Sequence, residues 1–197
     1  MKKKTWIIIG VAFGLPLVAI FGVFALGALF LASAKELPVT EADKDLIVDA
    51  FEFVPYYEDF APDAKYEGWE KLRYVGGTVD LTYEYDSPLE DEPYIRSTVT
   101  WDVSRSDANL TYALGWSSSI LGLNIADEEF DVQERDDYYA AGDRSRIGLI
   151  LYDGEEVGNL FVVGVGDTVL DFTISGFVMN DPGLWHELFD DIVSKLE

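Results

Sequence analysis

The chain has 197 residues, of which 37 are acidic and 14 basic, giving a net charge of −23. So acidic a surface repels phosphate backbones, and we expect no nucleic-acid partner. The chain contains no cysteine, which excludes disulfides, thiol catalysis and zinc–thiolate sites.

An uncharged, strongly apolar stretch follows three lysines at the N-terminus. No charged residue occurs from Thr5 to Leu31, and a helix of that length would cross the ~30 Å hydrocarbon core of a bilayer. Lys2, Lys3 and Lys4 would hold the N-terminus in the cytoplasm. We therefore predict a single-pass transmembrane signal-anchor over residues 1–34, with the lipid bilayer as the partner of Thr5 to Leu31.

A cleaved signal peptide is the alternative interpretation of the same segment. The sequence Ala32-Ser33-Ala34 matches the small-x-small cleavage pattern, although the apolar run is longer than the roughly 7–15 residues of a signal-peptide core. Both interpretations place the rest of the chain in the periplasm or outside the cell. They leave open whether the chain is cleaved after Ala34.

The remainder of the chain is more acidic than the whole. Without the three N-terminal lysines, 11 basic residues face 37 acidic ones, a net charge of −26. Such a domain attracts cations and basic partners. Acidic loops that bind divalent cations are one consequence, and simple solubility is the other.

Residues 35–40 form a short stalk, and residues 41–197 have the length of one domain. A helix is predicted to begin at Thr40, where Asp43 completes a variant of the capping box. The apolar face of this helix recurs at helical spacing. It comprises Leu46, Ile47, Ala50 and Phe51.

An aromatic-rich connection interrupted by Pro55 and Pro62 follows. One interpretation is a long loop whose rings pin it to the core. The other is a surface for a small ligand or a protein partner. Its candidate residues are Tyr56, Tyr57, Phe60, Tyr66 and Trp69.

Strand signals come next. Residues 72–75 lead into the hairpin pair Gly76-Gly77, and the return strand alternates, with Val79, Leu81, Tyr83 and Tyr85 on one face. An acidic turn over residues 87–93 precedes another strand. Its inward residues are predicted to be Ile95, Val99, Trp101 and Val103.

Residues 107–123 are predicted to be helical, with Asp107 as the N-cap. Gly115 and the three serines after Trp116 are small enough to let the helix lie close against a sheet. One stripe consists of Leu110, Leu114, Ser117 and Leu121, with Tyr112, Trp116 and Ile120 beside it.

The C-terminal part reads as strands and a closing helix. Short strands at 130–133 and 138–140 precede a meander over 147–152, 157–165 and 168–177, with turns at Asp153-Gly154 and Gly166-Asp167. The alternation breaks between Val169 and Phe172, which indicates either a bulge or burial on both faces. Asp181 and Pro182 begin a helix, whose stripe is Leu184, Leu188, Ile192 and Leu196.

These elements predict an α+β domain with a mostly antiparallel sheet and flanking helices. The meander 147–177, the closing helix 181–196 and the paired strands 72–86 resemble the PsbP-like α/β/α sandwich. The resemblance is one of layout, without a specific residue motif. It implies a docking or binding domain more than an enzyme.

No catalytic or cofactor-binding motif is present. The single histidine, His186, lies beside an apolar stripe and is expected to pack at a helix surface or core edge. We predict no cofactor. The acidic runs are candidates for a cation site without the EF-hand pattern. They are Asp127, Glu128, Glu129 and Asp131, and Glu90, Asp91 and Glu92.

Three hypotheses follow. The first is a non-enzymatic, membrane-anchored interaction or binding domain outside the cytoplasm. The second is a hydrolase that uses two carboxylates, which requires two acids in one concave pocket. The third is a structural module that depends on a divalent cation.

Overall fold

The computed structural model describes residues 34–56, 66–87, 93–127 and 129–196. Contacts divide the chain into residues 1–35 and 36–197, and the fold below is that of the second unit. The predicted span from Thr5 to Leu31 lies outside the described residues. Among the helices that are described, none is both long and apolar enough to cross a membrane.

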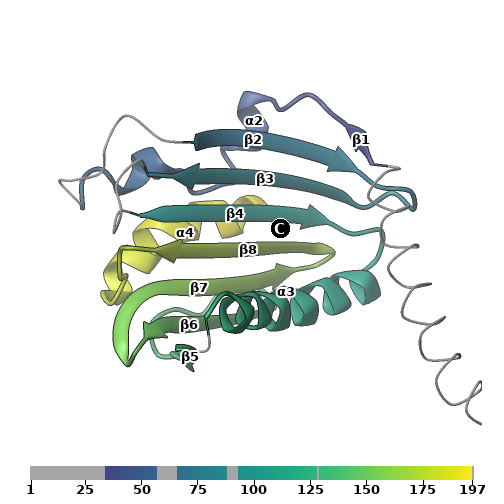
Figure 1. The fold of residues 1–197 in the computed structure, drawn as a ribbon. Coiled ribbons are helices and arrows are strands. Elements are labelled where there is room, and N and C mark those ends of the chain that lie inside the picture. Colours follow the sequence, from purple (N-terminus) through teal and green to yellow (C-terminus); the bar gives the residue numbers. More distant parts are fainter. Residues whose placement is uncertain (1–33, 57–65, 88–92, 128, 197) are drawn as a thin grey trace, which may run out of the picture. The chain divides into compact units, whose positions relative to one another are not determined.

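The domain is an α+β fold built on one eight-stranded sheet with the order β1-β2-β3-β4-β8-β7-β6-β5, as Figure 1 shows. Every pairing from β2 to β5 along this order is antiparallel. This confirms the predicted fold class and antiparallel sheet. The strands are β1 Lys35–Glu36, β2 Tyr66–Arg73, β3 Val79–Asp86, β4 Tyr94–Trp101, β5 Phe130–Glu134, β6 Arg144–Tyr152, β7 Glu155–Val165 and β8 Thr168–Ser175.

One face of the sheet carries the main hydrophobic core. It is covered by α4 (Pro182–Leu196) and the 3-10 helix η1 (Ala50–Phe53), together with Ile47 and Val48, which follow the short α2 (Glu41–Lys44). Among the largest fully buried side chains of this face are Tyr83, Phe161, Phe172, Trp185 and Phe189. Several of the rings meet edge to face or stacked with centroids 4.9–6.1 Å apart, which adds to the free energy of burial.

The closing helix follows the sequence prediction. Oδ1 of Asp181 accepts a hydrogen bond from the Gly183 amide at 2.8 Å, and α4 begins at Pro182. A buried amide fixes the chain before it, because Asn159 Oδ1 accepts a hydrogen bond from the Met179 amide at 2.6 Å. Trp185 Nε1 donates to the carbonyl of Met179 at 3.0 Å. The loop before α4 is therefore held by Asn159 of β7 and by Trp185 of α4 itself.

The opposite face is covered by α3 (Arg105–Ala126), which runs between the end of β4 and the start of β5. Figure 1 shows this helix over the β6–β8 side of the sheet. Its cluster is smaller and includes Ala108, Trp116, Leu160 and Val162. Two arginines of β6 lie over α3 rings, Arg144 over Tyr112 at 4.7 Å and Arg146 over Trp116 at 5.3 Å.

The predicted stripe of α3 faces solvent. Leu110, Leu114 and Leu121 are 60%, 55% and 58% exposed, whereas the flanking Tyr112, Trp116 and Ile120 pack on the sheet. The aromatic side chains bury more apolar area than leucine, and the arginines below them offer cation–π contacts. Periodicity alone could not choose between two adjacent stripes.

Several element boundaries differ from prediction. The capping box of Thr40 and Asp43 is present, but α2 has only four residues, and the predicted long helix is replaced by a break before η1, which leaves Phe51 62% exposed. α3 begins two residues before Asp107, because Ser104 is its N-cap and Asp107 the third residue.

Other predicted strands also differ from the structure, either in their bounds or because no strand forms. β2 starts at Tyr66 rather than residue 72, no strand forms at 138–140 although Tyr138 and Tyr139 are buried, and Val103 is 61% exposed beyond the end of β4. The break in alternation in β8 is two-sided burial: Val169 packs toward α3, and Phe172 packs toward α4.

Candidate functional site

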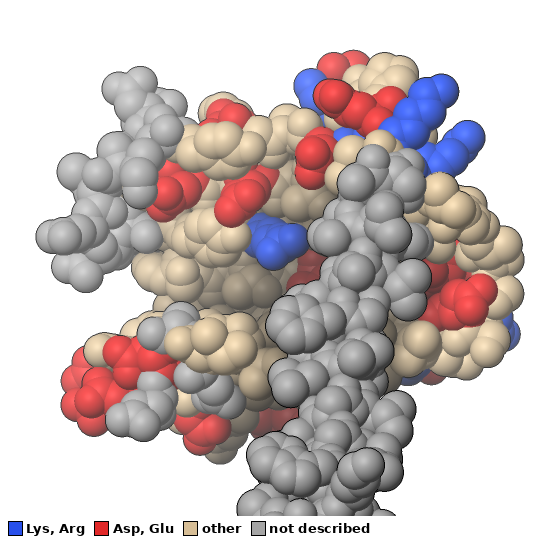
Figure 2. All heavy atoms as spheres, turned by 45° about the vertical axis from the view of Figure 1, so that its right-hand side comes forward, with Lys and Arg blue, Asp and Glu red and all other residues tan. Residues whose placement is uncertain are grey.

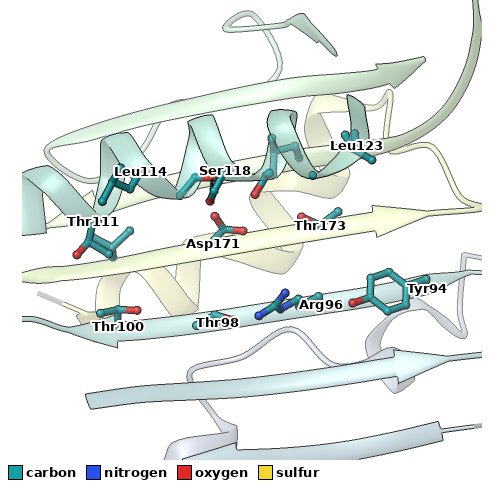
Figure 3. Close-up of a pocket in the computed structure, with 15 residues that line it drawn as sticks. Tyr94, Arg96, Thr98, Thr100, Thr111, Leu114, Ser118, Leu123, Asp171 and Thr173 are labelled. Atoms are coloured by element: carbon teal, nitrogen blue, oxygen red, sulfur yellow. Dashed lines mark hydrogen bonds between the residues drawn. The ribbon is translucent and has the colours of Figure 1, made fainter. Parts of the chain in front are cut away.

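A cleft with a volume of about 810 Å³ lies between α3 and the sheet. Strands β4 and β8 form its floor, and the inner side of α3 forms its wall (Figure 3). A cleft of this size is typical of small-molecule sites. It arises because α3 packs over the β6–β8 side and leaves β4 partly uncovered on this face.

The floor is polar because of strand alternation. On β4, Ile95 and Val99 are buried in the α4-side core. The even-numbered side chains that alternate with them therefore point toward α3. On β8 the same alternation turns the partly buried Asp171 and Thr173 toward α3. The polar floor residues are Tyr94, Arg96, Thr98, Thr100, Asp171 and Thr173.

Asp171 is the central charged group of the cleft. It sits in the middle of β8, directly opposite Thr98 of β4 and Val162 of β7, and Figure 3 shows its carboxylate directed toward α3. Among the described residues the carboxylate has no hydrogen bond or ion pair. Burial raises the pKa of Asp171 from 3.8 to about 6, and the charge of Arg96 only partly opposes this.

Gly115 on α3 makes room for this carboxylate. A Cβ atom at this position would lie 2.9 Å from Oδ2 of Asp171, closer than ordinary van der Waals contact. Any larger residue would therefore displace either the helix or the carboxylate. Gly122, seven residues later on the same helix and also lining the cleft, has no atom within 4 Å of such a Cβ.

Arg96 supplies the opposite charge. Its side chain is exposed, and it makes no ion pair within 4 Å among the described residues. Its charge nevertheless lowers the pKa of Asp171 and of Asp80, although burial dominates and raises both. Arg96 thus lies near enough to act on the cleft while its guanidinium donors are unused by these residues.

The hydroxyl groups around the cleft divide into two sets. Thr100 donates to Asp80 at 2.8 Å and Tyr94 to Glu84 at 2.9 Å, so these are already engaged with β3. Thr111, Ser119 and Thr173 have no side-chain hydrogen bond within the described part of the chain. The second set can therefore donate to, or accept from, a ligand.

The aromatic residues proposed from the sequence do not form one described surface. Tyr57 and Phe60 lie outside the described residues, and Tyr56 is exposed beyond η1. Tyr66 and Trp69 both belong to β2 but are three positions apart, so they lie on opposite faces. Trp69 packs on Tyr83 of the core with ring centroids 4.6 Å apart, while Tyr66 is 54% exposed.

The remaining sequence candidates that the structure describes are not among the residues that line the cleft. His186 is on the exposed side of α4, against the ring of Tyr139 and 3.2 Å from Asp190. Glu90, Asp91, Glu92 and Glu128 are outside the described residues. Within the residues that are described, no group of three or more His, Asp or Glu side chains is arranged to hold a metal ion. Figure 2 shows acidic side chains scattered over the face in view.

Sequence reasoning missed the cleft residues although a signal existed. On β4 the inward residues alternate with Arg96, Thr98 and Thr100, a pattern that predicts a solvent-facing side. This side lines a cleft only because α3 lies beside it in the folded structure. Asp171 stood within an apolar run, between Leu170 and Phe172. An acidic residue in a two-sidedly buried strand is itself unusual and was the available clue.

Comparison with known proteins adds no relationship: no family model, no curated protein and no solved structure matches the chain.

Proposed function

We propose that this protein is a non-enzymatic, membrane-anchored binding domain outside the cytoplasm, and that its ligand site is the cleft between α3 and strands β4 and β8. The observation that carries the proposal is Asp171, a partly buried carboxylate on the floor of the cleft that has no partner among the described residues. A carboxylate that is partly withdrawn from water without a partner costs stability. A ligand that donates to it would remove that cost.

The composition of the cleft supports binding over hydrolysis. A glycosidase-type mechanism needs two carboxyl groups facing one another across the substrate. Asp171 is the one carboxylate among the described residues that line the cleft. Asp80 lies on the neighbouring strand β3, outside this lining, and accepts a hydrogen bond from Thr100.

The anchor supports a site that works close to a membrane surface. The uncharged stretch from Thr5 to Leu31 and the three lysines before it are the basis of this part of the proposal. The mass of the chain extracted from membranes tests it. An intact 22.0 kDa chain supports an anchor, and loss of the first 34 residues contradicts it.

The ligand site is tested by thermal unfolding of the full chain in lipid nanodiscs, against a panel of amino acids, sugars, organic acids and amines. A ligand at about 100 times its Kd stabilises by about 2.7 kcal/mol. We expect at least one compound to raise the Tm of the wild-type protein.

A matched pair of variants locates the effect. Gly122→Phe puts a ring at the cleft, whereas Ala113→Phe puts the same ring on an exposed part of α3 that does not line it. The stabilisation should persist in Ala113→Phe and disappear in Gly122→Phe. Equal stabilisation of both variants, or none of the wild type by any compound, would contradict the proposal.

A further inference from the structure

Two opposite charges lie in the cleft without partners among the described residues. Thr98 of β4 pairs with Asp171 of β8, and Arg96 pairs with Thr173. Arg96 and Asp171 are therefore diagonal neighbours on the same face, a spacing of roughly 7–8 Å. No ion pair joins them, and within the described residues neither side chain has another one. Figure 3 shows both on the cleft floor.

This pair of charges selects against simple ions. An anion alone would meet the carboxylate of Asp171 within a domain whose net charge is −26, and would be repelled. A cation alone would gain from Asp171 but be opposed by the guanidinium of Arg96. A ligand with both charges can pair with both side chains at once, and these pairings offset the cost of desolvating its two charges.

The other side chains that line the cleft indicate the chemistry of the rest of the ligand. The hydroxyls of Thr111, Ser119 and Thr173 can donate or accept hydrogen bonds. The other walls are apolar and suit an aliphatic group. They are formed by Leu114, Leu123, Leu160 and Val169.

We infer that the cleft binds an amino-acid-type zwitterion, an α-amino acid or short peptide with an aliphatic side chain, whose ammonium group contacts Asp171 and whose carboxylate contacts Arg96. This inference rests on the proposed function, because it assumes that the cleft is the ligand site. It adds the chemical class of the ligand and the role of each charged side chain.

Calorimetry on the full chain in nanodiscs tests the inference with two probes, L-leucine and L-leucyl-L-leucine. Each is compared with its amide, which lacks the carboxylate, and with its N-acetyl form, which lacks the ammonium. Charge-assisted hydrogen bonds contribute enough that each change should weaken binding by about 10- to 100-fold.

Variants of the two charged side chains test which of them binds which end of the ligand. In Arg96→Gln, the parent zwitterion and its amide should bind equally, because the partner of the carboxylate is gone. In Asp171→Asn, the parent and its N-acetyl form should bind equally. Arg96→Lys keeps the charge and should retain part of the preference for the free carboxylate. This separates loss of an ion pair from general damage to the fold.

The outcomes separate the two proposals. If a probe binds but its amide or N-acetyl form binds as tightly, or if neither probe binds while another compound of the panel binds in the cleft, the zwitterion inference is wrong and the cleft remains a binding site. If a probe binds Gly122→Phe as well as the wild type, it binds elsewhere, and both proposals lose their support.

Discussion

The two faces of strand β8 differ in what their side chains do. Toward α4 the strand presents Leu170, Phe172 and Ile174, each fully buried in the large aromatic core. Toward α3 it presents Val169, Asp171 and Thr173, and two of these are polar residues of the cleft floor. One face of the sheet therefore supplies stability. The other keeps a carboxylate that has no partner within the described part of the chain, which reduces stability. Such a loss is typical of functional sites.

The largest effect is expected from the α4-side face. Phe172→Ala removes a fully buried ring that stacks with Phe53 and meets Phe189 edge to face. The loss of burial and the cavity left behind should destabilise the domain by about 3–5 kcal/mol. Thr173→Ala, the next residue on the other face, should cost about 1 kcal/mol or less. Equal losses in chemical denaturation would contradict the contrast between the faces.

A second, opposite effect is expected at Asp171. Its pKa is raised in the folded state from 3.8 to about 6, so the folded protein holds this proton more tightly than the unfolded chain. Stability from this group is complete below about pH 4 and is lost as the pH rises through 6. The shift of about two pKa units corresponds to about 3 kcal/mol.

Asp171→Asn should therefore stabilise the domain by up to about 3 kcal/mol at pH 7 and by little at pH 4, while weakening ligand binding. Urea unfolding at both pH values measures this. Asp136→Asn, at an exposed position, controls for the general relief of charge repulsion in so acidic a domain. A gain from Asp171→Asn that is the same at both pH values, or that Asp136→Asn reproduces, would show that burial of this carboxylate is not its source.

The smallest expected effect concerns the helix wall of the cleft. Gly→Ala inside a helix normally stabilises by about 0.5–1 kcal/mol. Gly122→Ala should show this gain, since its Cβ meets no atom within 4 Å. Gly115→Ala should show less, or a loss, because its Cβ would press on Oδ2 of Asp171. Thermal unfolding of the two variants compares them directly, and equal gains would mean that Gly115 does not shape the site.

Local signals explain which parts of the fold could be predicted from the sequence. Asp181 and Pro182 mark the start of α4, and Asp153-Gly154 marks the hairpin between β6 and β7, where both residues adopt positive φ angles of 49° and 80°. These features depend on a few neighbouring residues. The class of the fold followed from the succession of such hairpins.

The candidate site could not be predicted in the same way because it depends on contacts between distant segments. No short segment of the sequence indicates that α3 folds back over β4 and β8. Arg96 and Thr98 therefore resembled ordinary solvent-facing residues. Helical periodicity marked two adjacent apolar stripes on α3 and did not indicate which of them packs on the sheet. Burial on both sides of β8 was one of two open alternatives, and Asp171 within it went unnoticed.

The most direct test of this account is the titration of the Asp171 carboxyl group, followed by carbon NMR of the full chain and assigned with Asp171→Asn. We predict a midpoint near pH 6 without ligand and a lower midpoint when L-leucine or L-leucyl-L-leucine is bound, because an ammonium group favours the charged form. A midpoint near the ordinary value of about 4 without ligand would mean that the carboxylate is already solvated or paired, and would contradict the central claim.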